Sequence, residues 1–198
     1  MKIKLIVFDV DGTLYSSNVL RILIFIEIFL YLLVFPYKFR EIHYLWYFRK
    51  NRQHLSTLKS YNLSDKEYMN QNSKINLSSD SRKAIVEKWI MQKPLKYLKY
   101  LKYREITNFL DFLKNNKINY VFYSDYPISS KLNAMNIKYE KYYHANQETI
   151  NVLKPNLKGI KIILSDFNIK SSECLIVGDR DDIDGILAKE AKTLFINY

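Results

Sequence analysis

Short apolar runs recur along the chain, and they alternate with stretches of mixed polarity. The first run, from Ile3 to Phe8, is β-branched, aliphatic and aromatic with almost no polar alternation, which is typical of a strand buried on both faces of a parallel sheet. Similar runs predict strands at 118–124, 142–145, 174–179 and 193–197, and the stretches between them predict helices at 105–116, 129–136, 156–166 and 183–191. Because strands and helices alternate, we expect an α/β fold with an open parallel sheet and helices on both of its faces.

This alternation is interrupted between residues 15 and 104. The interrupting stretch holds 17 basic and 6 acidic residues, so it carries the entire formal net charge of +11. Such a shift in composition indicates a separate insert, and we expect one domain of residues 1–14 and 105–198 and a second of residues 15–104. The insert is predicted to be helical, because Ser64 to Glu67 form a capping-box pattern and Ser79 or Asp80 is a suitable N-cap for a later helix.

The insert begins with an unusually apolar segment. Val19 to Phe35 is apolar except for Arg21 and Glu27, and residues 36–52 after it are dense in aromatic and basic side chains. The segment is shorter than the ~20 residues that cross a bilayer core, so a simple spanning helix is not expected. Three interpretations stay open: a helix buried in the core of the insert or in a homodimer interface, an element that docks on an anionic membrane surface, and a membrane-inserted hairpin.

Composition excludes several classes of protein. The 198-residue chain is 48% hydrophobic, which suits one domain of ordinary size and a smaller partner. Its single cysteine, Cys174, excludes a disulfide framework, and three scattered histidines give little support to a histidine-based metal site. The basic run 96–104 accompanies no recognised nucleic-acid-binding motif, so we expect no nucleic-acid partner. A cytoplasmic location fits, with peripheral attachment to the inner face of the membrane as the open alternative.

Two acidic residues, Asp9 and Asp11, lie at the carboxyl end of the first predicted strand, and Gly12 and Thr13 follow them. Ligands of open α/β sheets bind beyond the carboxyl ends of the strands, and a glycine there frees the backbone for a close approach. Carboxylates so close repel each other unless a cation or a transferable proton relieves them. The pair therefore predicts a site for a cation or for acid–base chemistry.

Three further polar positions follow later apolar runs: Ser124 in "VFYSDYP", Lys154 in "VLKPN", and the acidic stretch "VGDRDDID" from Val177 to Asp184. Taken in order with "DVDGTL", they resemble the four motifs of the haloacid dehalogenase-like superfamily, in particular its phosphatases. The resemblance covers residues 1–14 and about 105–198. It implies a Rossmann-like core, with the insert as a helical cap between the first and second motifs.

The resemblance also implies a role for each motif residue in an Mg²⁺-dependent phosphomonoester hydrolase. Asp9 would be the nucleophile that forms an aspartyl phosphate, and Asp11 would be the general acid and then the general base. Ser124 would donate a hydrogen bond to the phosphoryl oxygens, and Lys154 would neutralise their charge. The Mg²⁺ would be held by Asp9, the backbone carbonyl of Asp11, and Asp179, which agrees with the oxygen ligands that this ion prefers.

Motif four leaves a choice among its acidic residues. The family spacing favours Asp184 as the second functional acid, with Asp182 in reserve, whereas Asp181 is expected to be a solvated loop charge. Thr13 is expected to help order the loop after the first strand. Asp125 directly follows the motif-two serine, and it is expected either to contact substrate or to be an exposed turn residue.

We expect the substrate to be a small or lipid-linked phosphomonoester, whose leaving group the cap selects. Two alternatives stay open: a phosphomutase acting on a small phosphorylated sugar, which would use the same motifs, and a membrane-associated scaffold with little catalysis. Asp11 argues against dehalogenation, because the resemblance implies that dehalogenases lack an acid at that position.

Overall fold

The protein is built around a five-stranded parallel sheet, seen in a computed structural model that describes residues 2–58, 63, 75 and 77–198. The strand order is β3-β2-β1-β4-β5, so β1 lies in the middle and pairs with β2 on one side and β4 on the other. The order confirms the predicted open parallel sheet. The strands are β1 (Leu5–Phe8), β2 (Asn119–Ser124), β3 (Tyr142–His144), β4 (Cys174–Gly178) and β5 (Leu194–Asn197).

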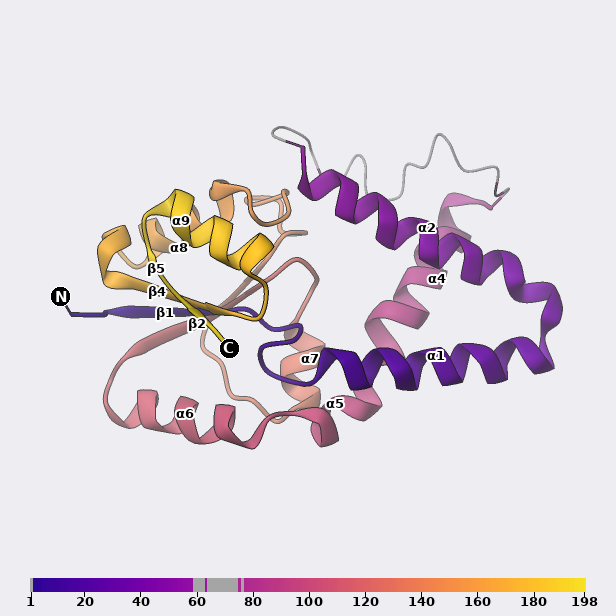
Figure 1. Ribbon diagram of the computed structural model, residues 1–198, viewed down its shortest axis with the longest axis horizontal. Helices are drawn as coiled ribbons and strands as arrows, with labels where there is room; N and C mark the ends of the chain where they lie inside the picture. The colour runs from indigo at the N-terminus through magenta and orange to yellow at the C-terminus, as the bar shows by residue number, and fades with distance from the viewer. Residues whose placement is uncertain (1, 59–62, 64–74, 76) are drawn as a thin grey trace.

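Helices cover both faces of the sheet, as predicted (Figure 1). Side chains of β1 alternate between two apolar cores, with Ile6 and Phe8 in one and Leu5 and Val7 in the other. All four are buried, which explains why this run shows no polar alternation. The helices of this part are α6 (Arg104–Asn115), α7 (Ser129–Ala134), α8 (Leu157–Asp166) and α9 (Ile186–Ala191), the last preceded by the π-helical turn η4 (Asp181–Gly185).

The described residues from Ser17 to Leu101 are mostly helical, as the insert was predicted to be, and they form an arm that extends away from the sheet (Figure 1). We call this segment, from Ser17 to Leu101, the helical arm. The chain enters and leaves it side by side, because Tyr15 forms an isolated antiparallel bridge with Lys102. Its elements are α1 (Ser17–Val34), η1 (Pro36–Lys38), α2 (Phe39–Ser56), α4 (Ser79–Val86), the π-helix η2 (Glu87–Gln92) and α5 (Leu95–Leu101).

Two helix N-cap predictions fall in the arm, and the structure describes the residues of only one of them. The N-cap of α4 is Ser78, whose Oγ accepts a hydrogen bond from the Ser81 amide at 3.2 Å, so the prediction of Ser79 or Asp80 was wrong by one or two residues. Three adjacent serine or acidic residues can all serve as caps, and only the backbone geometry decides among them. The predicted capping box at Ser64 to Glu67 lies outside the described residues.

Helix α1 confirms that the apolar segment is helical, but most of it does not lie in a core. Only Leu20 and Ile24 of its eighteen residues are buried. The interpretation of this segment as the core of the insert is therefore wrong for most of its side chains. By length and composition, the helix is long and apolar enough to cross a membrane.

Candidate active site

The carboxyl ends of the three central strands bring the sequence motifs together. Asp9 directly follows β1, Ser124 ends β2, and Asp179 directly follows β4. Because these strands are parallel neighbours, their carboxyl ends lie at one edge of the sheet, which faces the helical arm (Figure 1). Lys154 reaches the same edge from the loop between β3 and α8, and Asp184 reaches it from η4.

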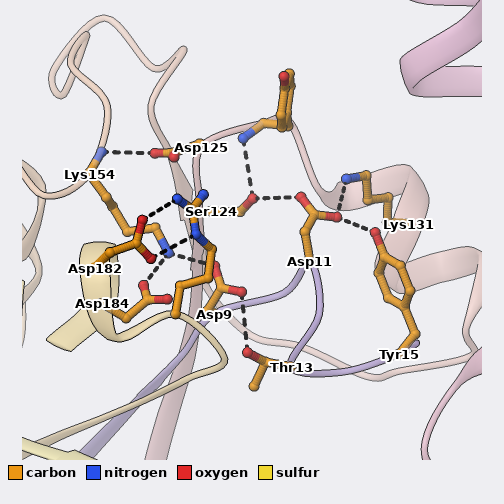
Figure 2. A network of polar contacts seen from close by, with 12 residues as sticks. Asp9, Asp11, Thr13, Tyr15, Ser124, Asp125, Lys131, Lys154, Asp182 and Asp184 are labelled. Atoms are coloured by element: carbon orange, nitrogen blue, oxygen red, sulfur yellow. Dashed lines mark hydrogen bonds and ion pairs between the residues drawn. The ribbon is translucent and has the colours of Figure 1, made fainter. Parts of the chain in front are cut away.

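The most deeply buried part of the site is an ion cluster centred on Lys154. Its Nζ lies 2.5 Å from Asp9 Oδ1 and 2.6 Å from Asp184 Oδ1, and all three side chains are almost fully buried (Figure 2). Burial alone would lower the pKa of Lys154, but the two carboxylates outweigh this effect and raise it well above its ordinary value. Lys154 is therefore a fixed positive charge at the position of motif three.

The environment of Asp9 has opposing effects on its pKa. Burial raises the pKa, Lys154 opposes the rise, and the carboxylates of Asp184 and Asp11 add to it, so that the value changes from 3.8 to about 7. Thr13 donates a hydrogen bond from Oγ1 to Asp9 Oδ2 at 3.2 Å. Asp9 is thus oriented by contacts at both oxygens, and the predicted role of Thr13 in ordering the loop stays a prediction.

Asp11 turns away from Asp9 toward a second set of partners (Figure 2). Lys131 Nζ lies 2.5 Å from its Oδ1, Tyr15 donates its phenolic hydrogen to the same oxygen, and Ser124 Oγ lies 3.3 Å from its Oδ2. Burial would raise the pKa of Asp11, but the charge and hydrogen bond of Lys131, with those of Tyr15 and Ser124, lower it. In this arrangement Asp11 is an ionised hydrogen-bond acceptor.

Lys131 and Tyr15 were missed by sequence reasoning. Lys131 is 5% exposed although it is a lysine, and it lies 120 positions from Asp11 in the chain. A lysine in a short predicted helix is usually a surface residue, so nothing in the local pattern marked it. Tyr15 lies four residues after Asp11 at the end of the motif-one loop, and its proximity to the two aspartates was the only available indication.

Gly12 is required by its geometry. Its φ is +111°, a backbone conformation that side chains rarely allow, and a Cβ at this position would lie 2.0 Å from Asp179 Oδ2. Because Gly12 has no side chain, its backbone can lie close to Asp179 without a clash, and Asp179 can occupy its position at the site.

The acidic residues fit the magnesium ion that the family resemblance implies. Carboxylate oxygens of Asp9, Asp179 and Asp184 all lie within 4.8 Å of one another, and Asp179 Oδ1 is buried with no hydrogen-bond partner among the residues that the structure describes. A buried carboxylate oxygen without a partner is costly unless a cation or water satisfies it. Burial, and then the nearby Asp184, raises the pKa of Asp179, and the positive charges of Lys154 and Arg180 only partly oppose this rise. This acidic group contains Asp9 and Asp179, which were expected as ligands of the ion, and also Asp184, which was not expected as a ligand.

Within motif four, Asp184 is the acid that reaches the site. Asp182, the reserve choice, pairs with Arg180 at 2.7 Å and its side chain is 69% exposed, so that choice was wrong. Asp181 is also exposed, as expected. The π-helical turn η4 explains the difference, because it directs the side chain of Asp184 inward beneath Gly178.

Asp125 connects three segments around the site. Its Oδ1 accepts a hydrogen bond from the Lys154 amide at 2.8 Å, and its backbone carbonyl accepts one from Arg52 of α2. The Arg52 guanidinium also lies 4.2 Å from the ring centroid of Tyr126. Arg52 is 4% exposed and was not singled out from the sequence, because it is one of several basic residues in α2. The predicted contact of Asp125 with substrate stays a prediction.

Comparison with known proteins identifies the class to which this fold and site belong. The family model of the haloacid dehalogenase-like hydrolases matches residues 3–192, so the chain is a member of that family. The search of curated proteins found no match.

Several solved structures share the fold. A 2-haloacid dehalogenase of Pseudomonas syringae is 17% identical with a TM-score of 0.64, and the match covers 99% of this chain and 86% of the other. A magnesium-bound HAD hydrolase of Bacillus subtilis is 13% identical with a TM-score of 0.64, covering 98% and 88%. A predicted phosphoglycolate phosphatase of Haemophilus somnus is 18% identical with a TM-score of 0.59, covering 100% and 85%. At these identities the likeness shows the fold, and the reaction has to be inferred from the site.

Proposed function

We propose that the protein is a Mg²⁺-dependent phosphomonoester hydrolase that forms an aspartyl phosphate on Asp9. The observation that carries the proposal is the meeting of two carboxylates, a hydroxyl and a buried lysine at one edge of the sheet: Asp9, Asp11, Ser124 and Lys154. A phosphoryl transfer needs a nucleophile, an acid for the leaving oxygen and positive charge around the phosphoryl group, and these residues offer all three.

In the first step, an oxygen of Asp9 attacks the phosphorus while the bond from phosphorus to the leaving oxygen breaks. The contacts from Thr13 and Lys154 hold the Asp9 carboxylate in one orientation, which reduces the cost of reaching the reactive geometry. Lys154 neutralises charge on the phosphoryl oxygens, and Ser124 donates a hydrogen bond to them. Protonated Asp11 gives its proton to the leaving oxygen.

In the second step, Asp11 takes a proton from water as the water attacks the aspartyl phosphate. The new bond joins the water oxygen to phosphorus, the bond to Asp9 breaks, and inorganic phosphate leaves. A base must be ionised to accept the proton, and the contacts with Lys131 and Tyr15 favour that form of Asp11. Before the first step, Asp11 has to exchange these partners for a proton and the substrate.

The magnesium ion would be held by Asp9, Asp179 and the backbone carbonyl of Asp11, with Asp184 close to the same position. When bound, it supplies positive charge that screens the carboxylates from the incoming phosphoryl group. The partnerless Asp179 Oδ1 is the observation that most favours a cation here.

We infer that the helical arm acts as the cap over this edge of the sheet and that the substrate is a small or lipid-linked phosphomonoester. Arg52 of α2 already contacts the loop after Ser124, so the arm and the motif-two loop meet beside the site. A cap in this position excludes water and restricts the leaving group.

Hydrolysis of an aryl phosphate tests the proposal. We expect turnover only with Mg²⁺ or a similar divalent ion, and we expect Asp9→Asn to abolish both turnover and formation of a phosphorylated protein. Asp181→Asn is the matched control, since it makes the same chemical change at an exposed position and should retain activity.

Three results would contradict the proposal in distinguishable ways. Full activity of Asp9→Asn would remove Asp9 as the nucleophile. A phosphorylated wild-type protein that passes its phosphoryl group to a sugar phosphate, and not to water, would identify a mutase. A folded wild-type protein without turnover on any phosphomonoester of a broad panel would favour a scaffold.

A further inference from the structure

Helix α1 has the reverse of the polarity that a surface helix of a globular protein shows. Its exposed apolar residues recur every three or four positions, so they form one outward face about 27 Å long. A surface helix ordinarily turns such a face to the core and its charges to solvent. The exposed apolar residues are Val19, Ile22, Phe25, Ile26, Phe29, Leu30, Leu33 and Val34.

The one acidic residue of α1 faces the interior of the arm. Glu27 lies 3.0 Å from Lys93 Nζ and 2.6 Å from Lys96 Nζ, and it accepts a hydrogen bond from Tyr97 at 2.5 Å. Burial would raise the pKa of Glu27, but these partners lower it to about 2. The contacts fix the rotation of α1 about its axis, so its apolar face is held outward.

The connections of the sheet show that α1 does not cross a membrane by itself. Strand β1 precedes α1 and pairs with β2 and β4, which both follow it, so the chain has to return to the side from which it started. Among the helices that the structure describes, only α1 is long and apolar enough to span. Helix α2, which follows it, carries Arg40, Glu41 and Arg49 among other charges. Helix α1 and the sheet therefore stay on the same side of any membrane. From that side, the outward face of α1 can contact an apolar surface.

The net positive charge of the arm favours a membrane over a second copy of the chain as the partner that covers the outward face of α1. The whole net charge of +11 belongs to residues 15–104, so two copies that met through α1 would bring like charges together, whereas anionic lipid would attract them. Arg21 in α1 and Arg40 just after it are exposed. Between them, Phe35 and Tyr37 extend the exposed apolar surface beyond the end of the helix.

We propose that the outward face of α1 docks on an anionic membrane surface, with the helix lying in the interface plane. The apolar side chains enter the boundary between headgroups and acyl chains, and the neighbouring basic side chains contact the headgroups. Apolar burial and charge together hold a protein at a bilayer where either alone is marginal. This inference does not depend on the proposed reaction, because it uses no residue of the site.

Co-sedimentation with vesicles tests the proposal on the full chain. We expect wild-type protein to sediment with phosphatidylcholine vesicles that contain phosphatidylglycerol, to bind less at high salt, and to bind pure phosphatidylcholine weakly. The triple variant Phe25→Ser, Phe29→Ser, Leu33→Ser should bind at least ~10²-fold more weakly, because three apolar side chains no longer leave water. Arg40→Gln should bind about fivefold more weakly at low salt, and this difference should vanish at high salt.

A double variant, Phe112→Ser with Ile196→Ser, is the matched control, since it removes exposed apolar side chains from α6 and β5. It should bind vesicles as the wild type does. Because the residues changed in α1 are 69%, 56% and 65% exposed, the triple variant should keep its circular dichroism and its unfolding temperature. Wild-type protein that ignores anionic vesicles at low salt would overturn the proposal, and so would a stable dimer that the triple variant abolishes.

Discussion

Replacement of Lys154 by methionine should affect both stability and turnover, and the structure indicates how much. Lys154 is 3% exposed and forms ion pairs with Asp9 and Asp184, which are 7% and 2% exposed. Methionine keeps most of the volume but leaves two buried carboxylates without their counter-charge. Removing one partner of a buried ion pair costs about 3–5 kcal/mol. For a chain of this size, the loss corresponds to a fall of roughly 6–20 °C in unfolding temperature.

The loss of stability of Lys154→Met relative to the wild type should depend on pH and on the Mg²⁺ concentration, and the charges of the site give the direction of each effect. Without Lys154, the folded-state pKa of Asp9 rises further above the ordinary value of 3.8. A carboxyl group whose folded-state pKa is raised destabilises the folded state as the pH rises above its unfolded pKa, so the deficit of the variant relative to the wild type should shrink as the pH falls toward about 7, where wild-type Asp9 also takes up a proton. A divalent cation restores positive charge, so Mg²⁺ should stabilise the variant more than the wild type.

Thermal unfolding followed by circular dichroism measures these effects, and hydrolysis of an aryl phosphate measures the rate. We expect at least ~10²-fold slower turnover, because a charge aimed at the phosphoryl oxygens in a water-poor site is worth several kcal/mol. Lys158→Met, at an exposed position of α8, is the control and should change stability by less than about 0.5 kcal/mol. An unchanged unfolding temperature of Lys154→Met at neutral pH would refute the assignment of Lys154 as the buried counter-charge.

Three further predictions concern single positions. Gly12→Ala should reduce Mg²⁺ affinity and activity at least ~10-fold, because the new Cβ would collide with Asp179 in a strained backbone; calorimetric titration with normal affinity would contradict this. Asp184→Asn should slow turnover much more than Asp182→Asn, because only Asp184 touches Lys154, and steady-state kinetics with the opposite ranking would show that motif four was misassigned. Arg52→Met should destabilise the protein by about 1–3 kcal/mol in denaturant unfolding, since it removes a buried charged donor from the Asp125 carbonyl, and unchanged stability would show that this contact is unimportant.

The sheet and the order of its motifs could be predicted from sequence because the information is local. A strand buried on both faces has to be apolar at every position, and β1 is buried from Leu5 to Phe8. Parallel strands place their carboxyl ends at one edge, so acidic and hydroxyl residues that follow apolar runs were expected to meet there. Asp9, Ser124 and Asp179 do lie at that edge.

Tertiary structure alone decided which other side chains reach the site and which way α1 faces. Lys131 and Arg52 are buried basic residues that approach from 120 and 73 positions away in the chain, and no local pattern separates them from the many exposed lysines and arginines. The α1 segment has apolar residues on all sides of the helix, so its sequence did not indicate which side would face the rest of the arm. That choice depends on the ion pairs of Glu27 with α5 and its flank, which exist only once the arm has folded. The periodicity of a sequence predicts which residues are buried from water. Which other residues they pack against depends on contacts between distant parts of the chain.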